Sequence, residues 1–229
     1  MFVDPSGKGK DQTAISCVKM LNGNLYVTEC LGLSGGYSDA VLEKISKIAR
    51  DNNINQILVE QNFGGGMFAE LLKPFLMRFH PCQVEDVRNN KTKELRIIDT
   101  LEPVMNSHRL IIDRKVIEKD FRSNPQETPE RRLKLQLVYQ LSRISRHRGS
   151  LVHDDLVDSL AGAVAYWTEY MAQNEDLNIS KRKEELLSIH TDNWNSLFNN
   201  TISQTAMGMT PQQIRNTNVS DQGFIKDFY

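Results

Sequence analysis

Acidic residues stand at the ends of apolar segments at three places in this chain, and they constrain its fold more than any other feature. Asp4 and Glu60 each end a short apolar run of strand type, while Asp154 and Asp155 open a long segment of helical periodicity. Carboxylates at strand ends are held at the rim of a sheet, and a helix that begins with carboxylates can add its own there. Oxygen-only clusters suit hard cations such as Mg²⁺ or Mn²⁺. The sequence therefore predicts one metal site.

The composition is that of an ordinary globular protein. The 229 residues suit one domain with extensions, 39% of them are hydrophobic, and the formal net charge is −1. The three cysteines lie far apart without CxxC spacing, which argues against a zinc ribbon or a disulfide framework. No run of 18 apolar residues occurs, so we predict no membrane-spanning segment and no membrane partner.

Hydrophobic periodicity predicts an α/β fold with a mixed sheet. Three antiparallel strands come first, and Asn22-Gly23 is a hairpin signal between the second and third. Helices and strands then alternate, which indicates parallel strands with helices on both faces of the sheet. The predicted strands are 1–4, 13–20, 24–33, 54–60, 83–87 and 109–112. The predicted helices follow Ser38 and Gly66 and cover 93–103, 129–144 and 154–171.

The residue types change after position 171. Asn, Gln, Ser and Thr become frequent, and only a short helix near 181–189 is expected there. We therefore predict a folded domain at 1–171 and a loosely structured polar extension at 172–229. The apolar end at 223–229 either folds back onto the domain or docks to a partner.

Three segments carry a resemblance to a known family. The order of elements resembles the ribonuclease H-like fold of retroviral-integrase type. Residues 3–13, 59–67 and 153–161 are similar to the first, second and third nuclease motifs of tailed-phage large terminase subunits. Residues 96–103 together with residues 106–110 resemble the short-tailed-phage branch of that family. The likeness covers residues 1 to about 171, and its specificity comes from three motifs in the right order and spacing.

The resemblance implies the site residues one by one. The core metal ligands, which are also the catalytic residues, would be Asp4, Glu60 and Asp155. Auxiliary ligands would be Asp11 and Asp154. Asp158 lies one helical turn further on and can face the same site, although we expect a structural role for it. Turn formation at Asp4 and helix capping at Asp154 or Asp155 are the alternative explanations.

The resemblance also implies a cofactor and an activity. Two Mg²⁺ or Mn²⁺ ions would lower the pKa of the attacking water and stabilise the leaving 3′ oxygen. The expected activity is that of an endonuclease that cuts concatemeric double-stranded DNA during viral genome packaging. It would act in the cytoplasm of the infected host and not as a stable part of the virion. Two alternatives remain open: a recombination nuclease of the Holliday-junction resolvase type, and a non-catalytic docking scaffold of the packaging machine.

The family also implies partners. Large terminases carry an ATPase motor upstream of the nuclease, but this chain begins almost on the first acidic strand. The Lys8-Gly9-Lys10 segment lacks the spacing of a Walker A loop, so we expect no ATPase here. The expected partners are double-stranded DNA and an upstream terminase ATPase domain or subunit, with the small terminase and portal proteins as further candidates.

Basic residues near the acidic motifs are candidates for DNA contact. They are Lys8, Lys10, Arg143, Arg146 and Arg148, and Arg88, Lys91 and Lys93 add positive charge near the site. The segment 143–148, just before the third motif, can form a track along the phosphates. Contacts of that kind bind any sequence and weaken with salt. A solvated loop is the equal alternative for this segment.

Overall fold

The computed structural model describes residues 1–6, 12–61, 66–88 and 92–206. The chain divides into two compact units, Met1–Met171 and Ala172–Tyr229. None of the helices in the described ranges is both long and apolar enough to cross a membrane. The border between the units lies where the residue types change, while the assignment of a function to each part stays a prediction.

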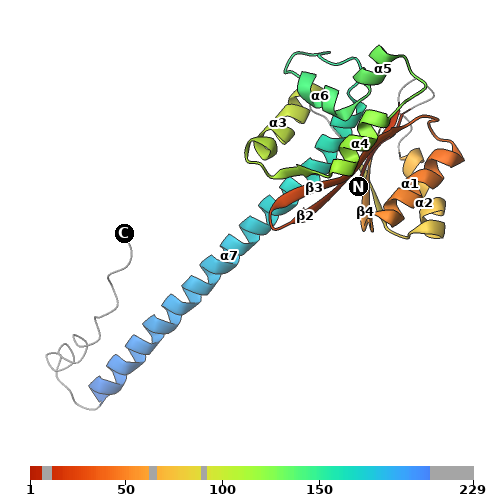
Figure 1. Cartoon of the computed structure of the whole chain (residues 1–229). Helices are drawn as coiled ribbons and strands as arrows, with labels where there is room; N and C mark the ends of the chain where they lie inside the picture. The colour runs from red at the N-terminus through yellow and green to blue at the C-terminus, as the bar shows by residue number, and fades with distance from the viewer. Residues whose placement is uncertain (7–11, 62–65, 89–91, 207–229) are drawn as a thin grey trace. The chain divides into compact units, whose positions relative to one another are not determined.

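A six-stranded mixed sheet forms the centre of the first unit, in the order β5-β4-β1-β2-β3-β6 (Figure 1). Its strands are β1 (Phe2–Asp4), β2 (Thr13–Leu21), β3 (Asn24–Leu33), β4 (Gln56–Glu60), β5 (Gln83–Val87) and β6 (Leu110–Ile112). The first three strands pair antiparallel, and β4, β5 and β6 join the sheet in parallel. The predicted mixed sheet is therefore confirmed.

The hairpin between β2 and β3 forms where the sequence predicts it. Asn22 and Gly23 make the two-residue turn that pairs Leu21 with Asn24. Their φ angles are 51° and 76°, both in the left-handed region that a type I′ turn requires. Asn and Gly adopt this region at little cost, so these two residues set the register of the longest pair of strands.

Helices cover both faces of the sheet. One face is covered by α1 (Asp39–Asp51) and α2 (Met67–Phe79), and the other by α3 (Lys93–Asn106), α4 (Arg114–Arg122), α6 (Leu137–Arg143) and the start of α7 (Asp155–Ala206) (Figure 1). Side chains alternate along a strand, so the neighbours Phe2 and Val3 enter different cores. Phe2 packs in the core that contains Leu160 of α7, and Val3 in the core that contains Ile45 of α1.

The predicted helix at 129–144 is two helices, α5 (Pro129–Lys134) and α6, and α4 was not expected from the sequence. The buried carboxylate of Asp120, at the end of α4, explains the break. It accepts hydrogen bonds from the backbone N–H groups of Leu137 and Val138, at 2.8 and 3.1 Å. These groups lie in the first turn of α6 and have no partner inside that helix. A tertiary contact therefore starts a new helix inside a continuous helical pattern.

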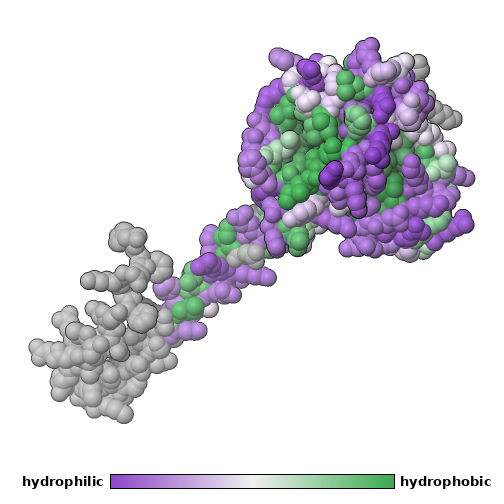
Figure 2. All heavy atoms as spheres, in the orientation of Figure 1, coloured by the Kyte–Doolittle hydropathy of each residue, from purple (hydrophilic) through white to green (hydrophobic). Residues whose placement is uncertain are grey.

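Helix α7 runs to Ala206, well past the predicted end near 171 and past the short helix expected at 181–189. The sequence has no glycine or proline between Gly162 and Gly208, so no helix breaker interrupts it. Hydrophobic and hydrophilic residues mix along the described part of this helix beyond residue 171 (Figure 2). Leu177 and Leu187, for example, are 58% and 66% exposed.

Candidate metal centre

Parallel pairing of β1 with β4 brings two of the predicted ligands to one rim of the sheet. Phe2 lies opposite Leu58, and each strand ends two residues later, at Asp4 and at Glu60. Because side chains alternate, both carboxylates lie on the face of Phe2 and Leu58, which packs against α7. Strand register alone therefore juxtaposes the two acids.

Helix α7 approaches this face closely because of Gly162. A Cβ atom added to Gly162 would lie 2.5 Å from the ring of Phe2, so only glycine fits without a shift of the strand or the helix. The Ser159 hydroxyl also donates a hydrogen bond to the Phe2 carbonyl, at 3.4 Å. Asp158 precedes Gly162 by one turn, so the same close packing carries its carboxylate to the strand ends.

Asp4, Glu60 and Asp158 form a group of three carboxylates. Each offers one oxygen, and these oxygens lie within 4.8 Å of one another. Asp158 is 2% exposed and Asp4 is 9% exposed, so much of the group is shielded from water. An oxygen-only donor set of this size fits Mg²⁺ or Mn²⁺. Three carboxylate oxygens leave coordination positions open for water or phosphate oxygens.

The third carboxylate of this group is Asp158, for which we expected a structural role, and the group does not include Asp155. Asp155 is the first residue of α7 and lies on the same side of the helix, roughly 4.5 Å further along its axis. The Asp154 carboxylate accepts a hydrogen bond from Lys93 at 2.8 Å. Asp11 lies outside the described residues. Metal binding by Asp155, Asp154 and Asp11 stays a prediction.

Two cations from α3 contact the group. The sequence placed Lys93 among the positive charges near the site, but it did not indicate which acids Lys93 contacts, and it gave no role there to Arg96. Arg96 Nη2 donates to Asp158 Oδ1 at 2.6 Å, and its Nη1 lies 3.7 Å from Glu60 Oε1. Lys93 Nζ lies 3.2 Å from Asp158 Oδ2. Their spacing of three residues places them on one side of a helix, and that is the signal that a search for paired charges could have used.

Burial dominates the electrostatics of the group. Burial raises the pKa of Asp158 to about 6, although Lys93 and Arg96 lower it and the nearby Glu60 raises it further. Burial also opposes the charged form of Lys93, but the carboxylates of Asp158 and Asp154 outweigh it and raise the pKa of Lys93 above its ordinary value. The ionised form of Asp158 is therefore costly in the absence of a bound divalent cation.

Arg146, one of the predicted DNA contacts, is held by acids of α3. Its Nη1 lies 3.0 Å from Asp99 Oδ1, and its Nη2 lies 3.0 Å from Glu102 Oε2. All three side chains are more than half exposed, and exposed pairs contribute little to stability. A phosphate can therefore replace these acids at small cost.

The other predicted DNA contacts have different surroundings. Arg143 is exposed and stacks its guanidinium over the ring of Tyr139, with 6.0 Å to the ring centre. Arg148 is also exposed. Lys8 and Lys10 lie outside the described residues. DNA binding by all of these residues stays a prediction.

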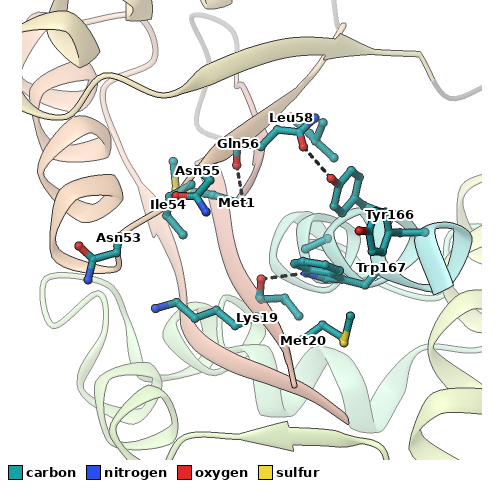
Figure 3. A pocket seen from close by; sticks show the side chains of 13 residues that line it. Met1, Lys19, Met20, Asn53, Ile54, Asn55, Gln56, Leu58, Tyr166 and Trp167 are labelled. Carbon is teal, nitrogen blue, oxygen red and sulfur yellow. Dashed lines mark hydrogen bonds between the residues drawn. The ribbon is translucent and has the colours of Figure 1, made fainter. Parts of the chain in front are cut away.

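A cavity of about 400 Å³ lies at the opposite end of β4, beside its first residue, Gln56 (Figure 3). The Tyr166 hydroxyl donates to Gln56 Oε1 at 2.6 Å, and Trp167 Nε1 donates to the Val18 carbonyl at 2.9 Å. Both aromatic residues belong to α7. Their hydrogen bonds tie the helix to the sheet and help to set its position along the strands.

Two solved structures of the large terminase nuclease domain of bacterial virus Sf6 resemble this chain. One is a mutant with manganese and β-thujaplicinol, with 12% sequence identity and a TM-score of 0.45, covering 71% of this chain and 86% of the other. The second is a mutant with calcium, with 13% identity and a TM-score of 0.44 over the same shares.

The chain also matches a protein family and a known protein by sequence. A family model described as "Terminase Bacteriophage T7, Ribonuclease H-like domain" matches residues 3–110. The large terminase subunit of Enterobacteria phage T3 is 37% identical over 187 residues, which cover 82% of this chain and 31% of that protein. The chain thus spans about a third of the length of this curated relative. It belongs to the large terminase subunits and carries their ribonuclease H-like nuclease domain, homologous to that of phage T3.

Proposed function

We propose that this chain is the metal-dependent endonuclease part of a viral DNA-packaging terminase, which cuts concatemeric double-stranded DNA. One observation carries the proposal. Three carboxylates from separate parts of the chain, Asp4, Glu60 and Asp158, converge within 4.8 Å at one rim of the sheet. Converging carboxylates repel one another, and Lys93 and Arg96 offset only part of their charge, so a bound divalent cation would stabilise the group further.

The donor set fits Mg²⁺ or Mn²⁺, and we expect two ions. Bound ions would supply Lewis-acid activation of water and neutralise charge on the phosphate. Asp4 and Glu60, on rigid strand ends, would hold the cations in a constant position. Asp158 would complete the set from α7, with Asp155 as the alternative third ligand. Asp154 and Asp11 are proposed as auxiliary ligands.

The substrate would be held by its phosphates. Lys8, Lys10, Arg143, Arg146 and Arg148 are the proposed contacts. Binding through phosphates is independent of sequence, as a nuclease that cuts long concatemers requires. The proposed setting is the infected host cell during genome packaging. The proposed partners are a terminase ATPase domain or subunit, the small terminase and the portal protein.

Plasmid cleavage by single variants tests the catalytic set. Asp4→Asn, Glu60→Gln and Asp158→Asn remove a charged ligand and nearly keep the shape of the side chain. Each should reduce cleavage with Mg²⁺ or Mn²⁺ on the order of a thousandfold, because several kcal/mol of transition-state stabilisation are lost. Asp51→Asn, at an exposed acid of α1, is the matched control and should cut like the wild type. Circular dichroism checks that every variant folds.

Three results would change the proposal. Near-normal cutting by Asp158→Asn together with loss in Asp155→Asn would restore Asp155 as the third ligand. Wild-type protein that cuts no DNA with Mn²⁺ would favour a docking scaffold. Cleavage of four-way junctions, but not of linear duplex, would favour a recombination nuclease.

A further inference from the structure

The negative charge of the three carboxylates, Asp4, Glu60 and Asp158, is already neutralised in part by two cations in the first turn of α3. Lys93 Nζ lies 2.8 Å from Asp154 Oδ1 and 3.2 Å from Asp158 Oδ2, and Arg96 Nη2 lies 2.6 Å from Asp158 Oδ1. Arg96 also reaches Glu60, at 3.7 Å. Both oxygens of Asp158 are thus engaged by α3 rather than left open.

A metal ion bound by Asp158 would compete with these contacts, because both oxygens of Asp158 are already paired. A divalent cation on a carboxylate weakens the ion pairs of that carboxylate with guanidinium or ammonium groups, because the positive charges then lie a few ångströms apart and repel one another. Arg96, Lys93 or both would therefore compete with a cation for Asp158 and Glu60, and binding of the cation favours an arrangement in which they have moved away.

One hydrogen-bond donor of Arg96, its Nε, has no partner among the described residues. The side chain of Arg96 is 13% exposed, and this Nε is buried. A buried donor without a partner is costly, and a planar guanidinium binds a phosphate through two parallel hydrogen bonds. A guanidinium released from Asp158 at this rim is well suited to an oxygen of a DNA phosphate.

We propose that Lys93 and Arg96 are built-in counter-cations: they hold the oxygens of Asp158 and Glu60 until a divalent cation binds, and then take a phosphate of the DNA. This inference rests on the proposed function and adds two positioning residues to it. It makes metal and DNA cooperative ligands, since each favours the arrangement in which α3 has left the carboxylates.

Metal affinity in the absence of DNA tests the competition directly. Titration calorimetry with Mn²⁺ at pH 8 is carried out on the wild type, Lys93→Gln and Arg96→Gln. Each variant removes one competing charge and keeps a side chain of similar length, so the dissociation constant should fall roughly tenfold or more. Arg96→Lys keeps the charge and should stay near the wild type. Arg50→Gln, at a surface ion pair of α1, is the matched control and should not change.

The outcomes separate this inference from the proposed function. Wild-type protein that binds Mn²⁺, with an Arg96→Gln variant that binds it no more tightly, overturns the inference alone. Absence of Mn²⁺ binding in the wild type and in both variants overturns the inference and the proposed metal centre together. Binding in Arg96→Gln but not in the wild type supports the competition in its strongest form.

Duplex DNA affinity tests the second half. Ca²⁺ takes the same type of oxygen ligand and serves as the probe cation. Ca²⁺ should raise the DNA affinity of the wild type at least fivefold and that of Arg96→Gln clearly less. Arg96→Lys keeps the charge but not the two parallel donors, so its rise should lie between them. An equal rise in Arg96→Gln would overturn the phosphate role.

Discussion

Asp158→Asn should stabilise the metal-free protein at neutral pH, although it removes a residue that forms two ion pairs. The substitution replaces a buried carboxylate by a neutral group of the same shape. Lys93 and Arg96 keep acidic neighbours in the variant, because Asp154 and Glu60 remain in place. No buried cation is therefore left without a counter-charge, which is the usual reason why breaking a buried ion pair is costly.

The magnitude follows from the pKa of Asp158, which burial raises from 3.8 to about 6. A tenfold change in an acid dissociation constant corresponds to about 1.4 kcal/mol, so the raised pKa amounts to about 3 kcal/mol. The sign follows from linkage. A carboxyl whose pKa is higher in the folded state contributes stability below pH 3.8 and loses it as the pH rises through about 6. Asn keeps the neutral form at every pH, so the variant should gain about 1–3 kcal/mol at pH 7.

Calorimetry and urea unfolding in EDTA measure this gain. Between pH 4 and pH 7 the stability of Asp158→Asn should rise relative to that of the wild type, with a difference of several degrees in melting temperature at pH 7. Asp155→Asn, one turn away on the same helix, is the matched control and should show a smaller effect. If Asp158→Asn unfolds more easily than the wild type in EDTA at pH 7, the ion pairs outweigh the burial of the charge and the reasoning is wrong.

Three further predictions concern the metal, the position of α7 and the DNA. Mg²⁺ or Mn²⁺ at a hundred times its dissociation constant should stabilise the wild type by about 2.7 kcal/mol in calorimetry and Asp158→Asn by much less; an equal gain in both would remove Asp158 from the site. Gly162→Ala should cost about 1–3 kcal/mol in urea unfolding and reduce cleavage, since its methyl group meets the Phe2 ring; normal stability and cleavage would show that the close approach is not needed. Alanine at all three arginines of 143–148 should weaken binding to every DNA sequence alike and flatten the salt dependence by about one unit per lost contact, whereas unchanged binding would make the segment a solvated loop. The substituted residues are Arg143, Arg146 and Arg148.

Much of the sheet could be predicted from the sequence, because its determinants are local. Alternation of side chains and the Asn22-Gly23 turn define the β2–β3 hairpin without reference to any distant residue. The positions of Asp4 and Glu60 at the ends of short apolar strands are equally local, and two parallel neighbours that end at the same level bring their last residues together. The length of α7 could also have been predicted, because no glycine or proline interrupts the sequence between Gly162 and Gly208. Our prediction ended this helix too early, near residue 171.

Only the tertiary structure decided which acid of α7 meets the other two. Asp155 and Asp158 lie on the same side of the helix, so spacing along the sequence cannot choose between them. The choice depends on where α7 lies along β1, and that position is set by the packing of Gly162 on Phe2.

The contacts of Arg96 and the break before α6 have the same origin. Arg96 pairs with Asp158 across 62 positions of sequence, and Asp120 caps Leu137 across 17. A sequence shows where a helix is favoured and where a charge lies. It does not show which distant residue will contact that helix or that charge in the folded protein. The sequence therefore determined the strands, the turn and two of the carboxylates, while packing between distant segments determined the third carboxylate and its counter-cations.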